Sequence, residues 1–387
     1  MDLATFEHLR SAAGQELLAE IHRCAGRESD LALGTRLRRD HPVELVAAAV
    51  TQNHLRGLAR TKLGDDAQHL YLTHDGLEQA TRASVAQHRA ARLVASGVER
   101  VVDLGCGIGA DLVTFARAGL AVRGVEIDPV RAAIAQANLE VLGLPGRVDC
   151  ADATTVPLEP DEVPFLDPAR RDGRGRVFDP ERMSPPWSHV TARLDGRAVV
   201  KTMPGLPHEL VPEGVEAEWV SDAGDLVEAC LWGGDLAGVP RRATALPGAA
   251  TLTGTGEPGE VGPVGRWLHE PDDAVIRAGL VGELAALVGG RLVDPRIAYV
   301  TTDASAAHPL MRSFEVLEEL PFREKPLKAA LVARDVGTLT IKKRGVDVVP
   351  EQLGRRLRLR GSQPATLVMT RAADAAVCLL VRPLPRP

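Results

Sequence analysis

One stretch of the sequence, in which a hydrophobic strand runs into a glycine-rich turn, restricts the possible folds more than any other. It reads Val101-Val-Asp-Leu-Gly-Cys-Gly-Ile-Gly109. Its paired valines are β-branched and suit a buried strand. Gly105, Gly107 and Gly109 allow the backbone to turn tightly and to lie against a ligand where a Cβ would collide. A helix expected from Ala110 to Ala118 would direct its N-terminus at that ligand, so the stretch predicts a cofactor loop.

A second short apolar strand follows, and it ends in an acid. It runs from Leu120 to Glu126, and Glu126 lies 21 residues after Gly105. This is the spacing at which an acid binds the ribose hydroxyls of a nucleotide in a βαβ unit. The second strand of such a unit lies beside the first, which brings the carboxylate to the ligand. The predicted cofactor therefore contains adenosine.

The glycine pattern, with Ala110 after it, also fits a permissive dinucleotide fingerprint, so a nicotinamide enzyme and a purely structural glycine turn are alternatives. Two features favour S-adenosylmethionine. Asp103 precedes the first glycine, where an acid can face the cationic methionine end, and Asp167 with Pro168 ends a later strand. With these features the chain resembles the class I S-adenosylmethionine-dependent methyltransferases, whose first motif is matched from Asp103 to Gly109. The resemblance implies S-adenosylmethionine as cofactor and a Rossmann-like sheet.

The length of the chain predicts more than one domain. At 387 residues it is too long for a single ordinary domain. We expect an α/β protein with a helical N-terminal domain (1–95), a Rossmann-like class I methyltransferase sheet (96–250) and a small C-terminal α/β domain (263–387). Between the last two, residues 251–265 are rich in Gly, Pro and Thr and predict a linker or an exposed loop. A helix is expected over 273–287.

The helical N-terminal region contains a capping signal. Asp75 is expected to cap a helix from Gly76 to about Ala95, because Glu78 follows three residues later. The stretch from Thr73 to Thr81 resembles the helix that precedes the cofactor domain in trimethylguanosine synthases. That resemblance implies a position near the cofactor, whereas an ordinary packing helix is the alternative.

From Arg100 onward strands alternate with helices, which predicts a mostly parallel sheet. The expected strands are Val101–Leu104, Ala121–Glu126, Arg147–Cys150, Val163–Leu166 and Ala198–Lys201. After the third strand, Asp152 resembles the acid of the family's third motif. The resemblance implies that Asp152 bonds the exocyclic amine of adenine, and a plain turn is the alternative.

The fourth strand ends in Asp167 and Pro168, at the carboxyl edge where open α/β sheets bind their substrates. Methyltransferases that act on amines carry Asp or Asn, Pro, Pro and an aromatic residue here. The resemblance implies that the Asp167 side chain and the Pro168 carbonyl accept hydrogen bonds from the target. This chain departs from the motif, because Ala169 and Arg170 occupy the last two places.

Two features could compensate for that departure. Ser184-Pro-Pro-Trp187 resembles the catalytic motif of trimethylguanosine synthase, and folded over the site it would supply Trp187 as the aromatic residue. Alternatively, Arg170 and Arg171 could bind a substrate phosphate through their guanidinium groups. The paired prolines could also form only a rigid loop.

Charge is distributed unevenly along the chain. The net charge is −6, yet the segment from Arg323 to Arg360 has eleven Lys or Arg against four acids, a local charge of +7. This asymmetry predicts an acidic body with one basic contact surface, although a solvated charged face is the alternative. Within this segment Lys342, Lys343 and Arg344 follow a predicted strand, and at least one of them should face outward to contact RNA phosphates.

The last third of the chain also resembles a THUMP-like domain. The resemblance rests on Pro321-Phe-Arg-Glu-Lys-Pro-Leu-Lys328, Gly337-Thr-Leu-Thr-Ile-Lys-Lys-Arg344 and Thr366-Leu-Val-Met-Thr-Arg371. THUMP domains present structured RNA to an attached catalytic domain. The resemblance implies RNA as the partner.

The expected function is S-adenosylmethionine-dependent methylation of structured RNA. A methyltransferase of a protein or small molecule and a non-catalytic S-adenosylmethionine-binding RNA adaptor are the alternatives. Five cysteines without a Cys-x-x-Cys pair argue against a disulfide framework and a zinc site. No metal is expected. Because no secretion signal or membrane-length apolar run is present, we expect a cytoplasmic protein with no membrane association.

Overall fold

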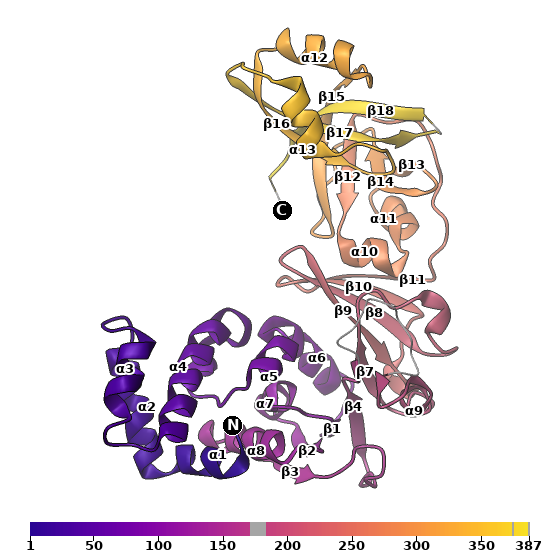
Figure 1. Ribbon diagram of the computed structural model, residues 1–387. Coiled ribbons are helices and arrows are strands. Elements are labelled where there is room, and N and C mark those ends of the chain that lie inside the picture. Colours follow the sequence, from indigo (N-terminus) through magenta and orange to yellow (C-terminus); the bar gives the residue numbers. More distant parts are fainter. Residues whose placement is uncertain (171–182, 374, 386–387) are drawn as a thin grey trace. The chain divides into compact units, whose positions relative to one another are not determined.

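The computed structural model describes residues 1–170, 183–373 and 375–385 (Figure 1). The chain forms two compact units. The first comprises residues 1–202, 212–215 and 231–236, and the second comprises residues 203–211, 216–230 and 237–387. The expected division into three domains stays a prediction, and its middle domain (96–250) contains residues of both units. None of the helices in the described ranges is both long and apolar enough to cross a membrane.

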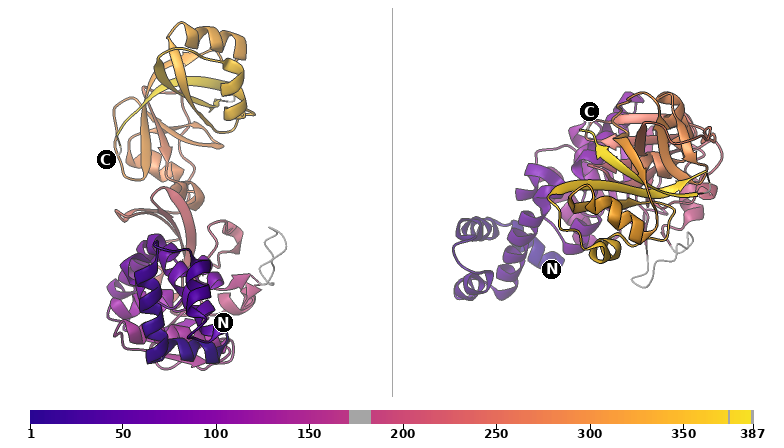
Figure 2. Two further views of the ribbon diagram at one scale, coloured as in Figure 1. Left: turned by 60° about the vertical axis from the view of Figure 1, so that its left-hand side comes forward. Right: turned by 90° about the horizontal axis from the view of Figure 1, so that it is seen from above.

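The first unit begins with four helices and a short 3-10 turn. They are α1 (Leu3–Arg10), α2 (Ala12–Cys24), α3 (Asp30–Leu37), α4 (Val43–Leu63) and η1 (Gly64–Gln68). Asp2, Ser11 and Ser29 cap the first three helices, each accepting a backbone N–H with its side chain. Figure 2 shows these helices in indigo as one group. Their apolar sides share a core with Ile108 and Ile134 of the cofactor-binding part.

The helix predicted from Gly76 to Ala95 is in fact two helices, α5 (His74–Gln79) and α6 (Ala83–Ala95). The expected cap is also wrong, because Thr73 rather than Asp75 accepts the N–H of Gly76, across 3.0 Å. At Ala80 the backbone becomes extended (φ −55°, ψ 140°), which ends α5 and redirects the chain into α6. Because of this break, α5 forms a separate short element.

Five strands of the first unit form a parallel sheet, as the sequence predicted. They are β1 (Arg100–Leu104), β2 (Ala121–Glu126), β3 (Arg147–Cys150), β4 (Glu162–Leu166) and β7 (Val199–Thr202). Their order is β7-β4-β1-β2-β3, and all four neighbouring pairs are parallel. The order reverses between β1 and β4, so a crevice is expected at the carboxyl ends of these two strands. The expected α/β class is confirmed.

Helices α7 (Ala110–Arg117) and α8 (Pro129–Val141) connect the first three strands. Asp128 caps α8 by accepting the N–H groups of Val130 and Arg131, each across 2.9 Å. The side chain of Asn138 on α8 is buried. It donates to the carbonyls of Tyr71 and Ile108 and accepts the N–H of Tyr71. Asn138 therefore ties the segment before α5 to the glycine loop.

A two-stranded ribbon follows β4. It consists of β5 (Ala169–Arg170) and β6 (Met183–Ser184), which pair antiparallel with Ala169 opposite Ser184. Helix α9 (Trp187–Thr191) comes next. The ribbon places the segment beginning at Ser184 beside the segment that follows Asp167, although they are far apart in the sequence.

The second unit contains two groups of strands. The first has the order β11-β10-β8-β9, from β8 (Glu216–Asp222), β9 (Asp225–Trp232, of which Leu231 and Trp232 belong to the first unit), β10 (Arg241–Leu246) and β11 (Ala250–Gly254). Two 3-10 turns, η3 (His208–Leu210) and η4 (Gly234–Leu236, in the first unit), lie between elements of this part of the chain. The predicted linker over 251–265 is wrong at its start, because β11 pairs antiparallel with β10 there.

The second group is a seven-stranded sheet of order β13-β14-β12-β15-β18-β17-β16. Its strands are β12 (Trp267–Pro271), β13 (Arg291–Asp294), β14 (Ile297–Thr302), β15 (Met311–Leu320), β16 (Val336–Lys343), β17 (Gln363–Ala372) and β18 (Ala375–Pro383). Its helices are α10 (Asp273–Ala278), α11 (Val281–Leu287), α12 (Glu324–Val332) and α13 (Pro350–Leu357). The single helix expected over 273–287 is divided, because Gly279 adopts φ 72° and ends α10.

Candidate active site

A cleft of about 330 Å³ opens where β1 and β4 end, at the crevice that the strand order predicts. Its volume is at the lower end of the range of known ligand sites. Its lining from the strand ends and the glycine loop comprises Asp103, Leu104, Gly105, Cys106, Gly107, Ile108, Ala110, Asp111, Val125, Glu126, Ile127, Phe165 and Asp167. Its other walls comprise Gly76, Gln79, Ala80, Arg131, Asp152, Ala153, Thr154, Ser184, Pro185 and Pro186. The stretch Thr73 to Thr81 thus contributes to the cleft, as its resemblance implied.

The glycine loop supplies the floor of the cleft. Gly105 and Gly107 have φ values of 100° and 56°, which side chains rarely adopt. A Cβ added to either residue would meet nothing within 4 Å, so it would enter open space beside the cleft that both residues line. Gly109 differs, because it does not line the cleft and its Cβ would lie 3.1 Å from that of Ala135 on α8. Gly109 is thus required by helix packing and by its φ of 80°.

Glu126 ends β2 at the cleft, and its carboxylate is held on both oxygens. Oε2 accepts the N–H of Gly107 across 3.0 Å, and Oε1 accepts the N–H of Asp128 across 2.9 Å. The side chain is buried. A ribose hydroxyl could still donate to Oε2, since a carboxylate oxygen can accept two hydrogen bonds.

Asp103 and Asp111 place two further carboxylates in the cleft wall. Asp111 on α7 accepts from Thr81 Oγ1 across 2.7 Å and from the buried guanidinium of Arg89. Asp103 is 2% exposed. Burial raises the pKa of Asp103 well above its ordinary value, and the charges of Asp111 and Asp167 raise it further. A cationic ligand beside Asp103 would stabilise its ionised form. This fits a cofactor that carries a sulfonium group.

Sequence reasoning did not identify Asp111 or Arg89. Asp111 stands in the first turn of α7, directly after the glycine loop, and that position could have indicated it. Arg89 could not be assigned from the sequence, because its partners become neighbours only in the folded chain. Its guanidinium also lies 4.7 Å from the ring centroid of Phe165, another residue of the cleft.

Asp152, the predicted adenine-binding acid, lines the cleft, and so does Ile127. Asp152 Oδ1 accepts the N–H and the hydroxyl of Thr154, across 2.8 and 2.7 Å. These bonds lower the pKa of Asp152. Asp152 therefore does form a turn, and its proposed bond to adenine would add to that role. Ile127 was not predicted, yet it lines the cleft and is 64% exposed, which offers an apolar surface for a flat ring.

Asp167 follows β4 and also lines the cleft. Lys201 on β7 donates to its Oδ2 across 2.5 Å. Pro168 is buried and is not among the residues that line the cleft. The predicted acceptor site is therefore formed by a carboxylate that already has a cation on one oxygen.

The ribbon of β5 and β6 brings Ser184, Pro185 and Pro186 to the cleft wall near Asp167. Trp187 starts α9, is 6% exposed, and is not among the cleft residues. It is therefore not placed to stack on an acceptor. Arg170 belongs to β5 and pairs with Met183, whereas Arg171 lies outside the described residues.

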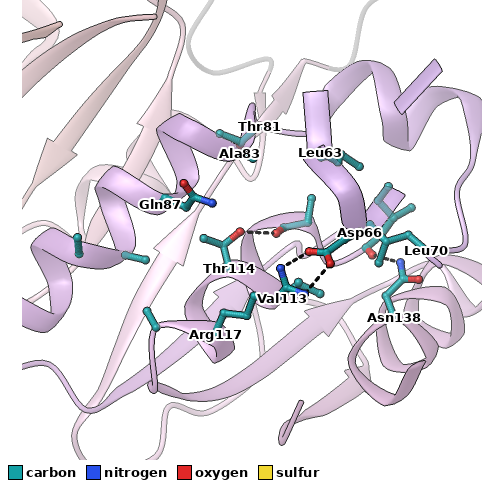
Figure 3. A pocket seen from close by; sticks show the side chains of 16 residues that line it. Leu63, Asp66, Leu70, Thr81, Ala83, Gln87, Val113, Thr114, Arg117 and Asn138 are labelled. Carbon is teal, nitrogen blue, oxygen red and sulfur yellow. Dashed lines mark hydrogen bonds and ion pairs between the residues drawn. The ribbon is translucent and has the colours of Figure 1, made fainter. Parts of the chain in front are cut away.

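A second cavity of about 260 Å³ lies behind the glycine loop (Figure 3). Ile108 and Ala110 line both this cavity and the cleft, so one turn of chain separates the two. Figure 3 shows Arg117 directed at Asp66, to which its Nη2 donates across 2.6 Å. Of the predicted site residues only Gly109 borders this cavity, which is therefore not the expected active site.

In the second unit, the predicted RNA-contacting residues face different ways. Lys342 donates to Glu270 across 2.6 Å, and the guanidinium of Arg344 lies 5.5 Å from the ring centroid of Tyr299. Lys343 is exposed. The expectation that at least one of the three faces outward therefore holds for Lys343.

Helices α12 and α13 and the residues that follow α13 carry exposed cations that the sequence analysis did not single out individually. Both helices pack on the core beside β16, β17 and β18, through Leu327, Leu331, Leu353 and Leu357. Four of these cations are exposed and form no ion pair with a described residue: Lys325, Arg355, Arg358 and Arg360. We call these four residues the cationic helical surface. Their pattern was visible in the sequence as basic positions between buried leucines.

These features together define a class of protein. A parallel sheet of this order, with a glycine loop after β1 and an acid at the end of β2, is the Rossmann-like arrangement that binds an adenosine cofactor. The carboxylates beside the loop suit a cofactor with a cationic methionine end. The fold and the cleft are those of a class I S-adenosylmethionine-dependent methyltransferase.

Comparison with known proteins identifies the family. The chain belongs to the S-adenosylmethionine-dependent methyltransferases. It is 41% identical over 331 residues to a family member of Mycobacterium tuberculosis strain H37Rv, covering 82% of this chain and 90% of the relative. The same figures hold for the protein of strain CDC 1551. The cofactor of the family is S-adenosylmethionine, as the sequence predicted.

Family models match three segments, described as a domain of unknown function (2–59), a methyltransferase domain (101–165) and a THUMP domain-like segment (311–383). A crystal structure of a proposed methyltransferase from Porphyromonas gingivalis W83 has a similar fold. It covers 96% of this chain and 99% of its own, with a TM-score of 0.77 and 22% identity. The suspected methyltransferase with a C-terminal THUMP-like domain is confirmed.

Proposed function

We propose that this methyltransferase acts on structured RNA in the cytoplasm. The observation that carries the proposal is the THUMP-like segment, which includes both helices of the cationic helical surface. Exposed cations without acidic partners bind phosphates and release counterions, which is the main source of affinity for nucleic acids. In this proposal the cationic helical surface and Lys343 contact the RNA backbone.

The first unit would hold the cofactor. Gly105 and Gly107 leave room for the methionine portion, and Asp103 faces its cationic end. Glu126 bonds the ribose hydroxyls, and Asp152 bonds the adenine amine. Gly109 acts indirectly, by allowing α7 and α8 to pack closely behind the loop.

Asp167 would orient the acceptor. A lone pair of the acceptor nitrogen or oxygen attacks the methyl carbon, the carbon–sulfur bond breaks, and its electron pair remains on sulfur. The acceptor proton passes to Asp167 and then to solvent. Because the sulfonium is already activated, holding the two reactants in line supplies most of the rate enhancement.

The Ser184–Pro186 segment would form the wall against which the acceptor lies, with the Pro168 carbonyl as a second acceptor of its hydrogen bonds. We assign Trp187 a supporting role, because its indole is buried. Arg170 and Arg171 stay candidates for a phosphate near the acceptor. The chain then lacks the usual aromatic residue of the motif, so the acceptor would be held by hydrogen bonds and by this proline wall.

Transfer of a labelled methyl group from S-adenosylmethionine to total cellular RNA, total cellular protein and a small-molecule extract tests the substrate class. We expect label in RNA only. Label in protein or the extract alone would establish the alternative substrates. Cofactor and RNA binding without transfer to any pool would establish the adaptor alternative.

The same assay tests the catalytic residues. Asp167→Ala should abolish transfer while calorimetry shows unchanged S-adenosylmethionine binding, since its bond to the acceptor strengthens as charge develops. Trp187→Phe keeps a large aromatic side chain in the same buried position and should retain most activity. Loss of activity in Trp187→Phe at unchanged melting temperature would instead show that the indole contacts the acceptor.

A further inference from the structure

The pairing of β4 with β7 sets the positions of Asp167 and Lys201. Strands β4 and β7 are parallel neighbours, with Phe165 opposite Val199 and Leu166 opposite Val200. Asp167, directly after β4, and Lys201, within β7, are the next two residues in this register. Both therefore emerge at the carboxyl edge side by side, and their approach does not depend on one choice of rotamer.

The side chains use this proximity. Lys201 Nζ lies 2.5 Å from Asp167 Oδ2, and the exposed fractions of the two side chains are 15% and 37%. A charge-assisted hydrogen bond in such a partly buried position is stronger and better directed than one at the surface. It fixes the orientation of the carboxylate and leaves Oδ1 for a ligand in the cleft.

The surroundings of Asp167 explain why a cation is needed there. Asp103 and Asp111 contribute two more carboxylates to the same cleft, and Arg89 is bonded to Asp111. Another nearby cation, Lys62, donates to the carbonyls of Leu77 and Glu78. Lys201 is thus the cation that the described contacts place on Asp167.

We propose that Lys201 is a positioning residue that holds the carboxylate of Asp167 in the direction of the acceptor. This inference rests on the proposed function, because it assigns Asp167 the acceptor. Because Lys201 neutralises the charge of Asp167, this pair adds no net attraction of its own for a cationic acceptor such as a protonated lysine. The acceptor it suits is a neutral N–H or O–H group, as a nucleotide provides.

The pairing of Lys201 with Asp167 can be tested without a methyl-transfer assay. The test is a double-mutant cycle in which the melting temperature is measured. Lys201→Met leaves a partly buried carboxylate unpaired and should lower the melting temperature by about 2 to 4 °C. Asp167→Asn in the Lys201→Met background should recover most of that loss, because the unpaired charge is gone. Additive losses in the two single variants and the double variant would overturn the pairing.

Kinetics test the positioning role. In Lys201→Met the kcat for RNA methylation should fall at least about 100-fold, whereas the KM for S-adenosylmethionine should change less than about 3-fold. Lys201→Arg keeps the charge and should recover at least about 10-fold of the lost kcat. Arg23→Met, which removes an exposed cation of α2 that has no proposed role in binding, is the control and should leave kcat unchanged.

The outcomes separate this inference from the function. An active wild type with an equally active Lys201→Met overturns the positioning role and leaves RNA methylation standing. An equal loss in Lys201→Met and Lys201→Arg at unchanged melting temperature also overturns it. A wild type that labels no RNA overturns the proposed function, and with it the role toward an acceptor, whereas the double-mutant cycle still decides the pairing.

Discussion

Arg131 on α8 lies 3.1 Å from Glu126, measured from Nη2 to Oε1. The acid that ends β2 is therefore held by a cation as well as by the backbone of the glycine loop and of Asp128. A ligand that bonds Glu126 meets a carboxylate whose direction is already fixed. This arrangement reduces the ordering that cofactor binding would otherwise require.

Glu126→Ala should weaken S-adenosylmethionine binding by about 1.5 to 3 kcal/mol, the range for hydrogen bonds to a charged group. Isothermal titration calorimetry measures the change directly. Glu16→Ala on the exposed side of α2 is the control and should bind like wild type. An affinity within a factor of two of wild type would remove Glu126 from the cofactor site.

Asp103→Asn should raise the stability of the cofactor-free protein at neutral pH and weaken S-adenosylmethionine binding. Burial raises the pKa of Asp103, so ionising it in the folded state costs free energy. A raised folded pKa stabilises the protein fully below the unfolded pKa of about 3.9, and this contribution is lost as pH rises through the folded pKa. The advantage of the variant should therefore grow with pH, to about 1 to 3 kcal/mol.

Denaturant unfolding of wild type and Asp103→Asn between pH 4 and pH 8 checks this prediction. The two free energies of unfolding should approach each other toward pH 4. A constant difference across the range would show that the substitution acts through packing and not through the charge. Saturating S-adenosylmethionine should reduce or reverse the stability advantage of Asp103→Asn. Only the wild-type carboxylate carries a negative charge that attracts the sulfonium of the cofactor.

Gly76→Ala should destabilise the first unit by about 1 to 3 kcal/mol, the usual effect of overpacking. The added Cβ would lie 2.6 Å from Ile108 Cγ2 and 2.6 Å from Thr73 Oγ1, the cap of α5. Gly57→Ala is the control, since its Cβ meets nothing within 4 Å on α4. Thermal unfolding should show that control more stable, by about 0.5 to 1 kcal/mol.

Replacing Arg355, Arg358 and Arg360 together by Ser should flatten the salt dependence of RNA binding. Each lost phosphate contact reduces the slope of log K against log salt by about 0.7 to 0.9. Filter binding between 50 and 250 mM salt measures it. The exposed residues Arg23, Arg38 and Arg39, replaced together by Ser, serve as a control of equal charge. Equal slopes in the two triple variants would reduce the cationic helical surface to a solvated face.

The sequence predicted the sheet well, because most of its strands are short, largely apolar runs followed by a turn. The strands at Ala121–Glu126 and Arg147–Cys150 match their predicted bounds. Helix breaks were harder to predict. Ala80 ends α5 although alanine favours helices, since the chain turns there to lay α5 against Ile108. Such a break depends on tertiary contacts that periodicity does not contain.

In the site, too, features set by the local sequence could be predicted, whereas contacts between residues distant in sequence could not. Gly105 and Asp167 directly follow predicted strands and Glu126 ends one, so the topology of a parallel sheet alone brings them together. The inward direction of Lys342 could not be predicted, because Glu270 and Phe314 lie on strands distant in sequence. Lys201 is intermediate between residues that the sheet topology places and residues whose contacts cannot be predicted. Its pairing with Asp167 could have been derived from the adjacency of the two predicted strands.

The hydrogen bonds of Asn138 bear on how such a protein can evolve by recombination. This one side chain bonds the backbone on both sides of α5, at Tyr71 and Ile108. The leading helices and the cofactor-binding strands also share one apolar core. A crossover near residue 95 would leave that core uncovered in both products. We therefore expect gene fusions and domain exchanges in this lineage to carry the helices and the nucleotide-binding strands as a single heritable module.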